Sequence, residues 1–155
     1  PRVKPVPMRS LNKWRYTMAQ FQIGTISHGT LRTEDLIPAF IETLTSLGGT
    51  LPNDLGGTKF RHAHYLLTSR VMETLTDALQ ELAPPFIYFG AHPGDGSDFG
   101  FWPNWDAIDD IQRFNKANSD GDIILDYEGI RINVSDHGNV EVYSLATGES
   151  LWSCV

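Results

Sequence analysis

The spacing of apolar side chains divides the chain into segments with two different periods. Residues 18–26 alternate apolar and polar positions, which predicts a half-buried β-strand. In the next segment the apolar side chains recur on one helical face: Leu36, Ile37, Phe40, Ile41, Leu44 and Leu47. This helix should end at the glycine pair that follows. Pro38 is tolerated in a first helical turn, so it favours Asp35 over Thr33 as the N-cap.

A second helical stripe is predicted from about His62 or His64 to Leu82. Its buried positions recur with helical spacing: Leu67, Val71, Leu75, Ala78, Leu79 and Leu82. Two prolines that follow, Pro84 and Pro85, end this helix.

The most distinctive stretch is Phe86–Trp102, in which two aromatic runs flank a turn at residues 93–97. This pattern predicts a β-hairpin, with His92 capping its turn. Residues 103–116 then predict a short helix capped by Asn104. Asn118 to Asp122 is expected to form a turn. Three short alternating segments predict a C-terminal meander: 130–134, 140–145 and 151–155.

This order of elements predicts the α+β class. We expect a mostly antiparallel sheet made of the N-terminal strand, the hairpin and the meander, with about three helices packed on one face. A length of 155 residues suits one domain over residues 18–155, preceded by a flexible basic arm at residues 1–17. No apolar run approaches the length of a membrane span, and Cys154 is the only cysteine. We therefore expect a cytoplasmic protein without disulfides.

Charge is distributed unevenly along the chain. Five of the twelve Lys and Arg residues lie within residues 1–16, where none of the nineteen acids is found. From residue 95 onward, twelve acids face only three basic residues. Direct nucleic-acid binding by the folded body is disfavoured, because contact with phosphates depends on Lys and Arg. An acidic body can instead dock on a basic protein surface or simply keep the protein soluble.

Several side chains suggest metal chemistry without completing a known motif. His92, Asp95 and Asp98 share the hairpin and could act with His28, but the spacing matches no zinc signature. The simpler interpretation is a turn stabilised by its own aspartates and glycines. A second segment resembles a calcium-binding loop, with an amide at Asn118 and carboxylates at Asp120, Asp122 and Asp126. It lacks the required glycine and the bidentate glutamate, so we expect neither a metal nor another cofactor.

Aromatic side chains in and after the hairpin are too numerous for one face of a small sheet, so we expect some to reach the surface. Exposed aromatics bordered by acids are typical of an interface anchor with a charged rim. The alternative is that the tryptophans only cover the end of the sheet. The partner-binding residues that this pattern predicts are Asp95, Asp98, Phe101, Trp102, Trp105, Asp106, Asp109, Asp110, Asp120 and Asp122.

Two segments, which begin at His28 and at Phe89, resemble stretches of small uncharacterised proteins encoded by phages and other mobile elements. The first reads His-Gly-Thr-Leu-Arg-Thr-Glu-Asp-Leu-Ile-Pro-Ala-Phe, and the second reads Phe-Gly-Ala-His-Pro-Gly-Asp-Gly-Ser-Asp-Phe-Gly-Phe-Trp. The resemblance assigns no chemistry to any residue. It implies a setting in which small acidic proteins act on host machinery, including inhibitors of host defence of the anti-CRISPR type.

These observations lead to three hypotheses from different classes. The first is a non-enzymatic phage accessory protein that binds and inhibits a host defence protein through an acidic, aromatic surface. The second is a small metal-dependent hydrolase or nucleotide-processing enzyme that uses the histidines and aspartates of the hairpin. The third is a structural phage component that buries its aromatics in a homo-oligomer.

Overall fold

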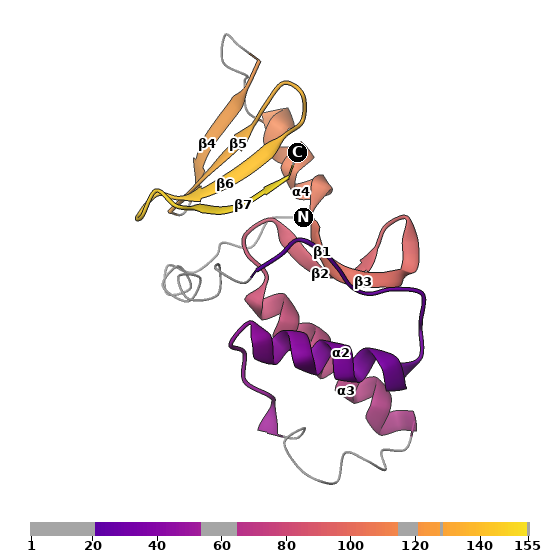
Figure 1. The fold of residues 1–155 in the computed structure, drawn as a ribbon. Coiled ribbons are helices and arrows are strands. Elements are labelled where there is room, and N and C mark those ends of the chain that lie inside the picture. The colour runs from indigo at the N-terminus through magenta and orange to yellow at the C-terminus, as the bar shows by residue number, and fades with distance from the viewer. Residues whose placement is uncertain (1–20, 54–64, 115–120, 128, 155) are drawn as a thin grey trace. The chain divides into compact units, whose positions relative to one another are not determined.

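Three helices and two antiparallel sheets make up the computed structural model, which describes residues 21–53, 65–114, 121–127 and 129–154 (Figure 1). The elements in chain order are β1 (Gly24–Ser27), α2 (Thr33–Ser46), α3 (Tyr65–Leu82), β2 (Ile87–His92), β3 (Asp95–Pro103), α4 (Trp105–Phe114), β4 (Ile123–Tyr127), β5 (Ile130–Val134), β6 (Val140–Ser144) and β7 (Ser150–Cys154). The α+β class is confirmed, and the strands divide between a three-stranded and a four-stranded sheet. The expected basic arm at residues 1–17 lies outside the described residues.

The chain divides into two compact units. The helical unit comprises Ala19–Ala83 and Tyr88–Trp102, and the meander unit includes Pro84–Ile87 and Pro103–Val155. The expectation of one domain over residues 18–155 stays a prediction. No helix in the described part of the chain is long and apolar enough to cross a membrane.

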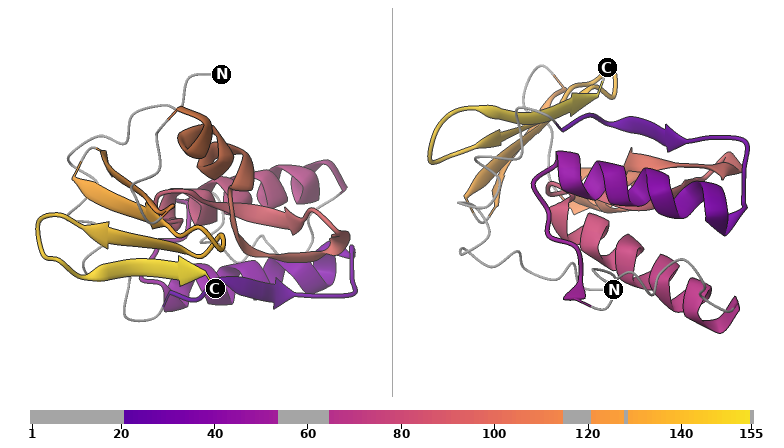
Figure 2. Two further views of the ribbon diagram at one scale, coloured as in Figure 1. Left: turned by 90° about the horizontal axis from the view of Figure 1, so that it is seen from above. Right: turned by 60° about the horizontal axis from the view of Figure 1, so that its bottom comes forward.

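In the helical unit, β3 lies between β1 and β2 in an antiparallel sheet, and α2 and α3 cover one face of it (Figure 2). Contacts between aromatic rings connect helix α2 to the sheet. The Phe40 ring of α2 lies 4.9 Å from that of Phe89 on β2 and 5.7 Å from that of Phe99 on β3. Because strand side chains alternate between faces, Phe99 and Phe101 both point toward the helices.

Both predicted helical stripes are present, but α2 begins earlier than expected. Its first residue is Thr33, its N-cap position is Arg32, and Asp35 lies within the first turn. The prediction of Asp35 as N-cap was therefore wrong. Pro38 lies in the second turn, where it removes the N–H that would bond the Glu34 carbonyl. This carbonyl belongs to an exposed residue near the helix end, where water can serve as its partner.

A close approach of β1 and β3 explains one glycine of the hairpin. A Cβ atom added to Gly100 would lie 2.1 Å from the backbone oxygen of Gly24. Only a residue without a side chain fits there, because real Cβ contacts do not reach that distance.

The meander unit contains a sheet in which β4, β5, β6 and β7 pair in sequence order. The last three strands were predicted, but β4 was missed. Ile123 is 9 % exposed and its neighbour Ile124 is 54 % exposed, so β4 carries apolar residues on both faces and lacks a clear alternation. The buried face of the sheet consists of Ile123, Ile130, Ile132, Val134, Val140, Val142 and Trp152.

The short segment Pro84–Ile87 is attached to the C-terminal part of the meander unit by two hydrogen bonds. The indole Nε1 of Trp152 donates to the Pro85 carbonyl over 2.7 Å, and the Asn104 N–H donates to the Phe86 carbonyl over 2.8 Å. Phe86 has a φ of 64°, which a residue with a side chain rarely adopts. The second bond holds the carbonyl of this strained residue, and it places the start of α4 beside the segment.

Candidate interaction surfaces

Two separate groups of predicted residues remain at the surface, and each belongs to one unit. We call the first the hairpin surface, formed by His28, Asp95, Asp98 and Trp102 in the helical unit. We call the second the α4 surface, formed by Trp105, Asp106, Asp109 and Asp110 in the meander unit.

The tip of the hairpin is a self-bonded turn. One oxygen of Asp95 accepts hydrogen bonds from the Ser97 N–H over 2.9 Å and the Ser97 hydroxyl over 2.8 Å. The other oxygen lies 3.2 Å from Nε2 of His28. The bonds from Ser97, together with His28, hold the pKa of Asp95 below its usual value. Since His28 is 63 % exposed, this contact is a surface pair and a modest constraint on the turn.

The other two residues named for a metal-dependent enzyme, His92 and Asp98, form hydrogen bonds with other residues of the hairpin and of β1. Asp98 is half-buried: its Oδ2 accepts a hydrogen bond from the Thr25 hydroxyl over 3.2 Å, and its Oδ1 is buried without a hydrogen-bond partner among the described residues. Nδ1 of His92 accepts the Gly94 N–H over 3.0 Å, which confirms that His92 caps the turn. Within the described residues, no group of three His, Cys, Asp or Glu side chains could hold a metal ion. For the hypothesis of a metal-dependent enzyme, the geometry therefore provides one histidine–aspartate contact, between His28 and Asp95.

The two aromatic residues of the hairpin have different surroundings. Phe101 is 1 % exposed and its ring lies 5.0 Å from that of Phe89, so it belongs to the core and not to a partner-binding surface. Trp102 is half-buried, and its Nε1 donates to the Gly90 carbonyl over 3.0 Å. Its ring lies 4.7 Å from that of His92 in an edge-to-face arrangement. Strand alternation explains why adjacent aromatics separate in this way.

The α4 surface follows from the amphipathic sequence of this helix. Asn104 caps it as predicted, because its Oδ1 accepts the Ala107 N–H over 3.1 Å. Ile108 is 1 % exposed, whereas Trp105 is 44 % exposed. At about 100° per residue, Asp109 and Asp106 lie about 40° and about 100° around the helix from Trp105, whereas Asp110 lies about 140° away from it.

The charges on this surface are only partly neutralised. Asp110 lies 3.3 Å from the guanidinium of Arg113, at the i,i+3 spacing. Among the residues that the structure describes, Asp106 and Asp109 form no ion pair. Both are exposed, so their negative charge is directed to solvent.

The remaining predicted acids do not join either surface. Asp120 lies outside the described residues. Asp122 is half-buried and accepts the backbone N–H of Asp136 over 3.2 Å, so it joins the start of β4 to a later turn. Asp126, in the segment that resembles a calcium-binding loop, forms a bidentate pair with Arg131, at 2.6 and 2.9 Å, which lowers the pKa of Asp126. This carboxylate is neutralised by a protein cation.

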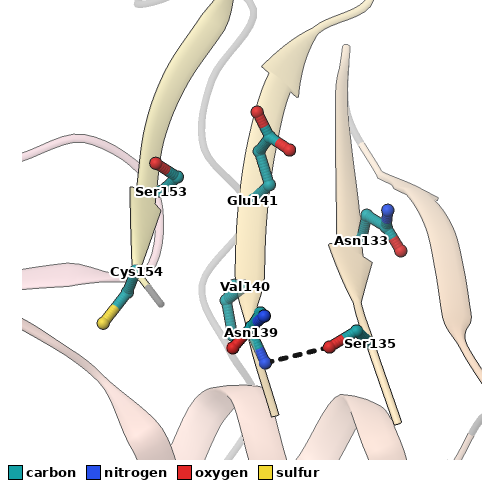
Figure 3. A pocket seen from close by; sticks show the side chains of 7 residues that line it. All are labelled: Asn133, Ser135, Asn139, Val140, Glu141, Ser153 and Cys154. Carbon is teal, nitrogen blue, oxygen red and sulfur yellow. Dashed lines mark hydrogen bonds between the residues drawn. The ribbon is translucent and has the colours of Figure 1, made fainter. Parts of the chain in front are cut away.

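A hollow in the meander unit was not foreseen from the sequence. It has a volume of about 290 Å³ and lies on the four-stranded sheet, lined by seven residues: Asn133, Ser135, Asn139, Val140, Glu141, Ser153 and Cys154 (Figure 3). These are ordinary strand and turn residues without a motif. Only the pairing of β5, β6 and β7 brings them together.

Comparison with protein-family models, curated proteins and solved structures gave no match to this chain. The resemblance to proteins of phages and mobile elements therefore stays an expectation. The geometry of the two surfaces and the hollow is the basis for the functional argument.

Proposed function

We propose that this chain is a non-enzymatic accessory protein that docks on a basic surface of a host protein through its α4 surface. The observation that carries the proposal is an exposed tryptophan on α4 beside two carboxylates that form no ion pair within the described part of the chain. Trp105 and Asp109 are four residues apart, and Asp106 and Asp109 are three apart, so these side chains lie along the same part of α4.

The chemistry of this group suits protein recognition. A tryptophan contributes a large contact area and is enriched among the residues that dominate binding energy. Carboxylates around it attract a basic partner, accelerate association and make binding sensitive to salt. The net charge of −7 acts in the same direction.

The proposed class of partner is based on the negative charge of the chain and on its resemblance to proteins of phages and mobile elements. A mobile-element protein acts inside the bacterial cytoplasm, where defence nucleases have basic surfaces for nucleic acids. We propose such a nucleic-acid-binding defence protein as the partner, with inhibition caused by occupation of its basic surface. The acidic protein would then compete with the nucleic acid.

The test begins with a pull-down of the tagged chain from bacterial lysate at moderate and high salt, read by mass spectrometry. The captured protein is then purified, and its affinity is measured for the native chain and for two variants. Trp105→Ala should weaken binding about tenfold or more, as expected for an anchor residue. Asp106→Asn combined with Asp109→Asn should slow association and reduce its salt dependence.

A matched control separates local from general electrostatics. Glu42→Gln combined with Glu149→Gln removes the same charge from exposed positions outside α4. If this control reduces affinity as much as the α4 variant, the proposed surface is wrong. Failure to capture any partner that depends on Trp105 would contradict the binding function itself.

A further inference from the structure

Strand pairing and hydrogen bonds of a turn position the residues that line the hollow on the four-stranded sheet. Asn133 pairs with Glu141 and Glu141 pairs with Ser153, so the three side chains form one row across β5, β6 and β7. At one end, the Asn139 N–H donates to the Ser135 hydroxyl over 3.1 Å, as drawn in Figure 3. The Ser135 N–H also donates to the Asn139 carbonyl, over 2.9 Å. Paired strands and a bonded turn thus hold the lining side chains in place.

The carboxylate of Glu141 sets the chemistry of a ligand at this hollow. Oδ1 of Asn133 is buried and has no hydrogen-bond partner among the described residues, but it has no accessible surface that a ligand could contact. Glu141 and Tyr143 are two residues apart on β6 and share one face of the sheet, and Glu141 raises the pKa of Tyr143. The carboxylate of Glu141 has several acceptor sites, so it can take donors from a ligand.

The rest of the lining is neutral and polar. Ser135, Asn139 and Ser153 can each donate and accept hydrogen bonds, and the lining contains one carboxylate and no Lys, Arg or His. Phosphates and carboxylates are therefore repelled, whereas a cation with N–H donors is attracted. Hydroxyl groups match the serine and asparagine side chains, since they also donate and accept.

We infer that this hollow binds a small organic ligand that carries an ammonium group beside hydroxyl groups, in the class of amino sugars and amino alcohols. The ammonium group pairs with Glu141, and the hydroxyls bond the serines and Asn139. None of the α4 residues takes part, so this site is independent of the proposed docking function.

The test uses the full chain labelled with ¹⁵N and follows the side-chain amide signals of Asn133 and Asn139. Glucosamine is titrated at about pH 6, below the pKa of an ordinary amine, in a buffer free of amino alcohols. Glucose supplies hydroxyls without the cation, and methylammonium supplies the cation without hydroxyls. We expect saturable shifts with glucosamine and an affinity at least about tenfold lower for each of the other two probes.

Variants show whether the named side chains are responsible. Glu141→Gln should weaken glucosamine about tenfold or more, because a charged hydrogen bond is replaced by a neutral one. Glu149→Gln removes an exposed carboxylate outside the lining and should leave the affinity unchanged. Unchanged backbone signals from β4 and from the buried residues of the four-stranded sheet verify that the meander unit of each variant is folded. The inference is overturned if glucosamine gives no saturable shift, if glucose binds equally well, or if Glu141→Gln binds like the native chain.

Discussion

Replacing Trp152 with phenylalanine tests the bond that attaches Pro84–Ile87 to the last strand of the meander. Trp152 is 5 % exposed, and its indole Nε1 donates to the Pro85 carbonyl over 2.7 Å in a buried setting. Phenylalanine keeps an aromatic ring at this position but has no N–H group. The variant therefore leaves a buried carbonyl without its partner.

The magnitude follows from two contributions. A buried polar group that loses its partner costs about 1–3 kcal/mol. The smaller ring adds about 1 kcal/mol for incompletely filled space in the core. The free energy of unfolding should therefore fall by about 2–4 kcal/mol. With a urea m-value of about 1–3 kcal/mol per M, the unfolding midpoint should fall by about 0.7 M or more.

The assay is urea unfolding followed by far-UV circular dichroism, because the chain has four tryptophans and fluorescence changes with each substitution. Trp105→Phe is the matched control, since Trp105 is 44 % exposed and its replacement should change stability by no more than about 0.5 kcal/mol. Equal midpoints for the two variants would refute the reasoning, because the buried bond would then contribute nothing measurable.

Three further predictions concern packing, capping and pH. Gly100→Ala should destabilise the chain by more than about 2 kcal/mol in urea unfolding, because its Cβ would lie 2.1 Å from the Gly24 oxygen. Asn104→Ala should cost about 1 kcal/mol in the same assay, because it removes the cap of α4. Arg131 lowers the pKa of Asp126 in the folded chain. The pair therefore stabilises the fold fully at pH values above the pKa of Asp126 in the unfolded chain, and this stabilisation is lost as the pH falls through the lower pKa of Asp126 in the folded chain. Carbon-13 NMR of the carboxyl groups should therefore show the pKa of Asp126 rising in Arg131→Ala.

Controls for these predictions come from the same elements. Gly96→Ala should be mild, because nothing lies within 4 Å of a Cβ at Gly96. Asn104→Asp should retain most of the cap, since a carboxylate also accepts the N–H bond. An equal cost for both glycine variants, or for both Asn104 variants, would contradict the proposed causes. A pKa of Asp126 that does not move in Arg131→Ala would show that the ion pair is not formed in solution.

Local patterns in the sequence were sufficient for the helices and the hairpin. The stripe at Leu36, Phe40 and Leu44 and the stripe at Val71, Leu75 and Leu79 are buried as predicted. An amphipathic period is a property of one segment, and the partner that covers it need not be known. The Asn104 cap was predictable for the same reason, because it depends on atoms only three residues apart.

Only the tertiary structure decided which residues meet across the chain. The sequence did not reveal β4, whose two faces are both apolar, or the burial of Phe101, which the aromatic pattern assigned to a partner-binding surface. The contact between His28 and Asp95 and the row formed by Asn133, Glu141 and Ser153 depend on strand pairing between distant segments. The residue type determines which interactions a side chain can form, whereas strand register and packing determine which other groups it contacts.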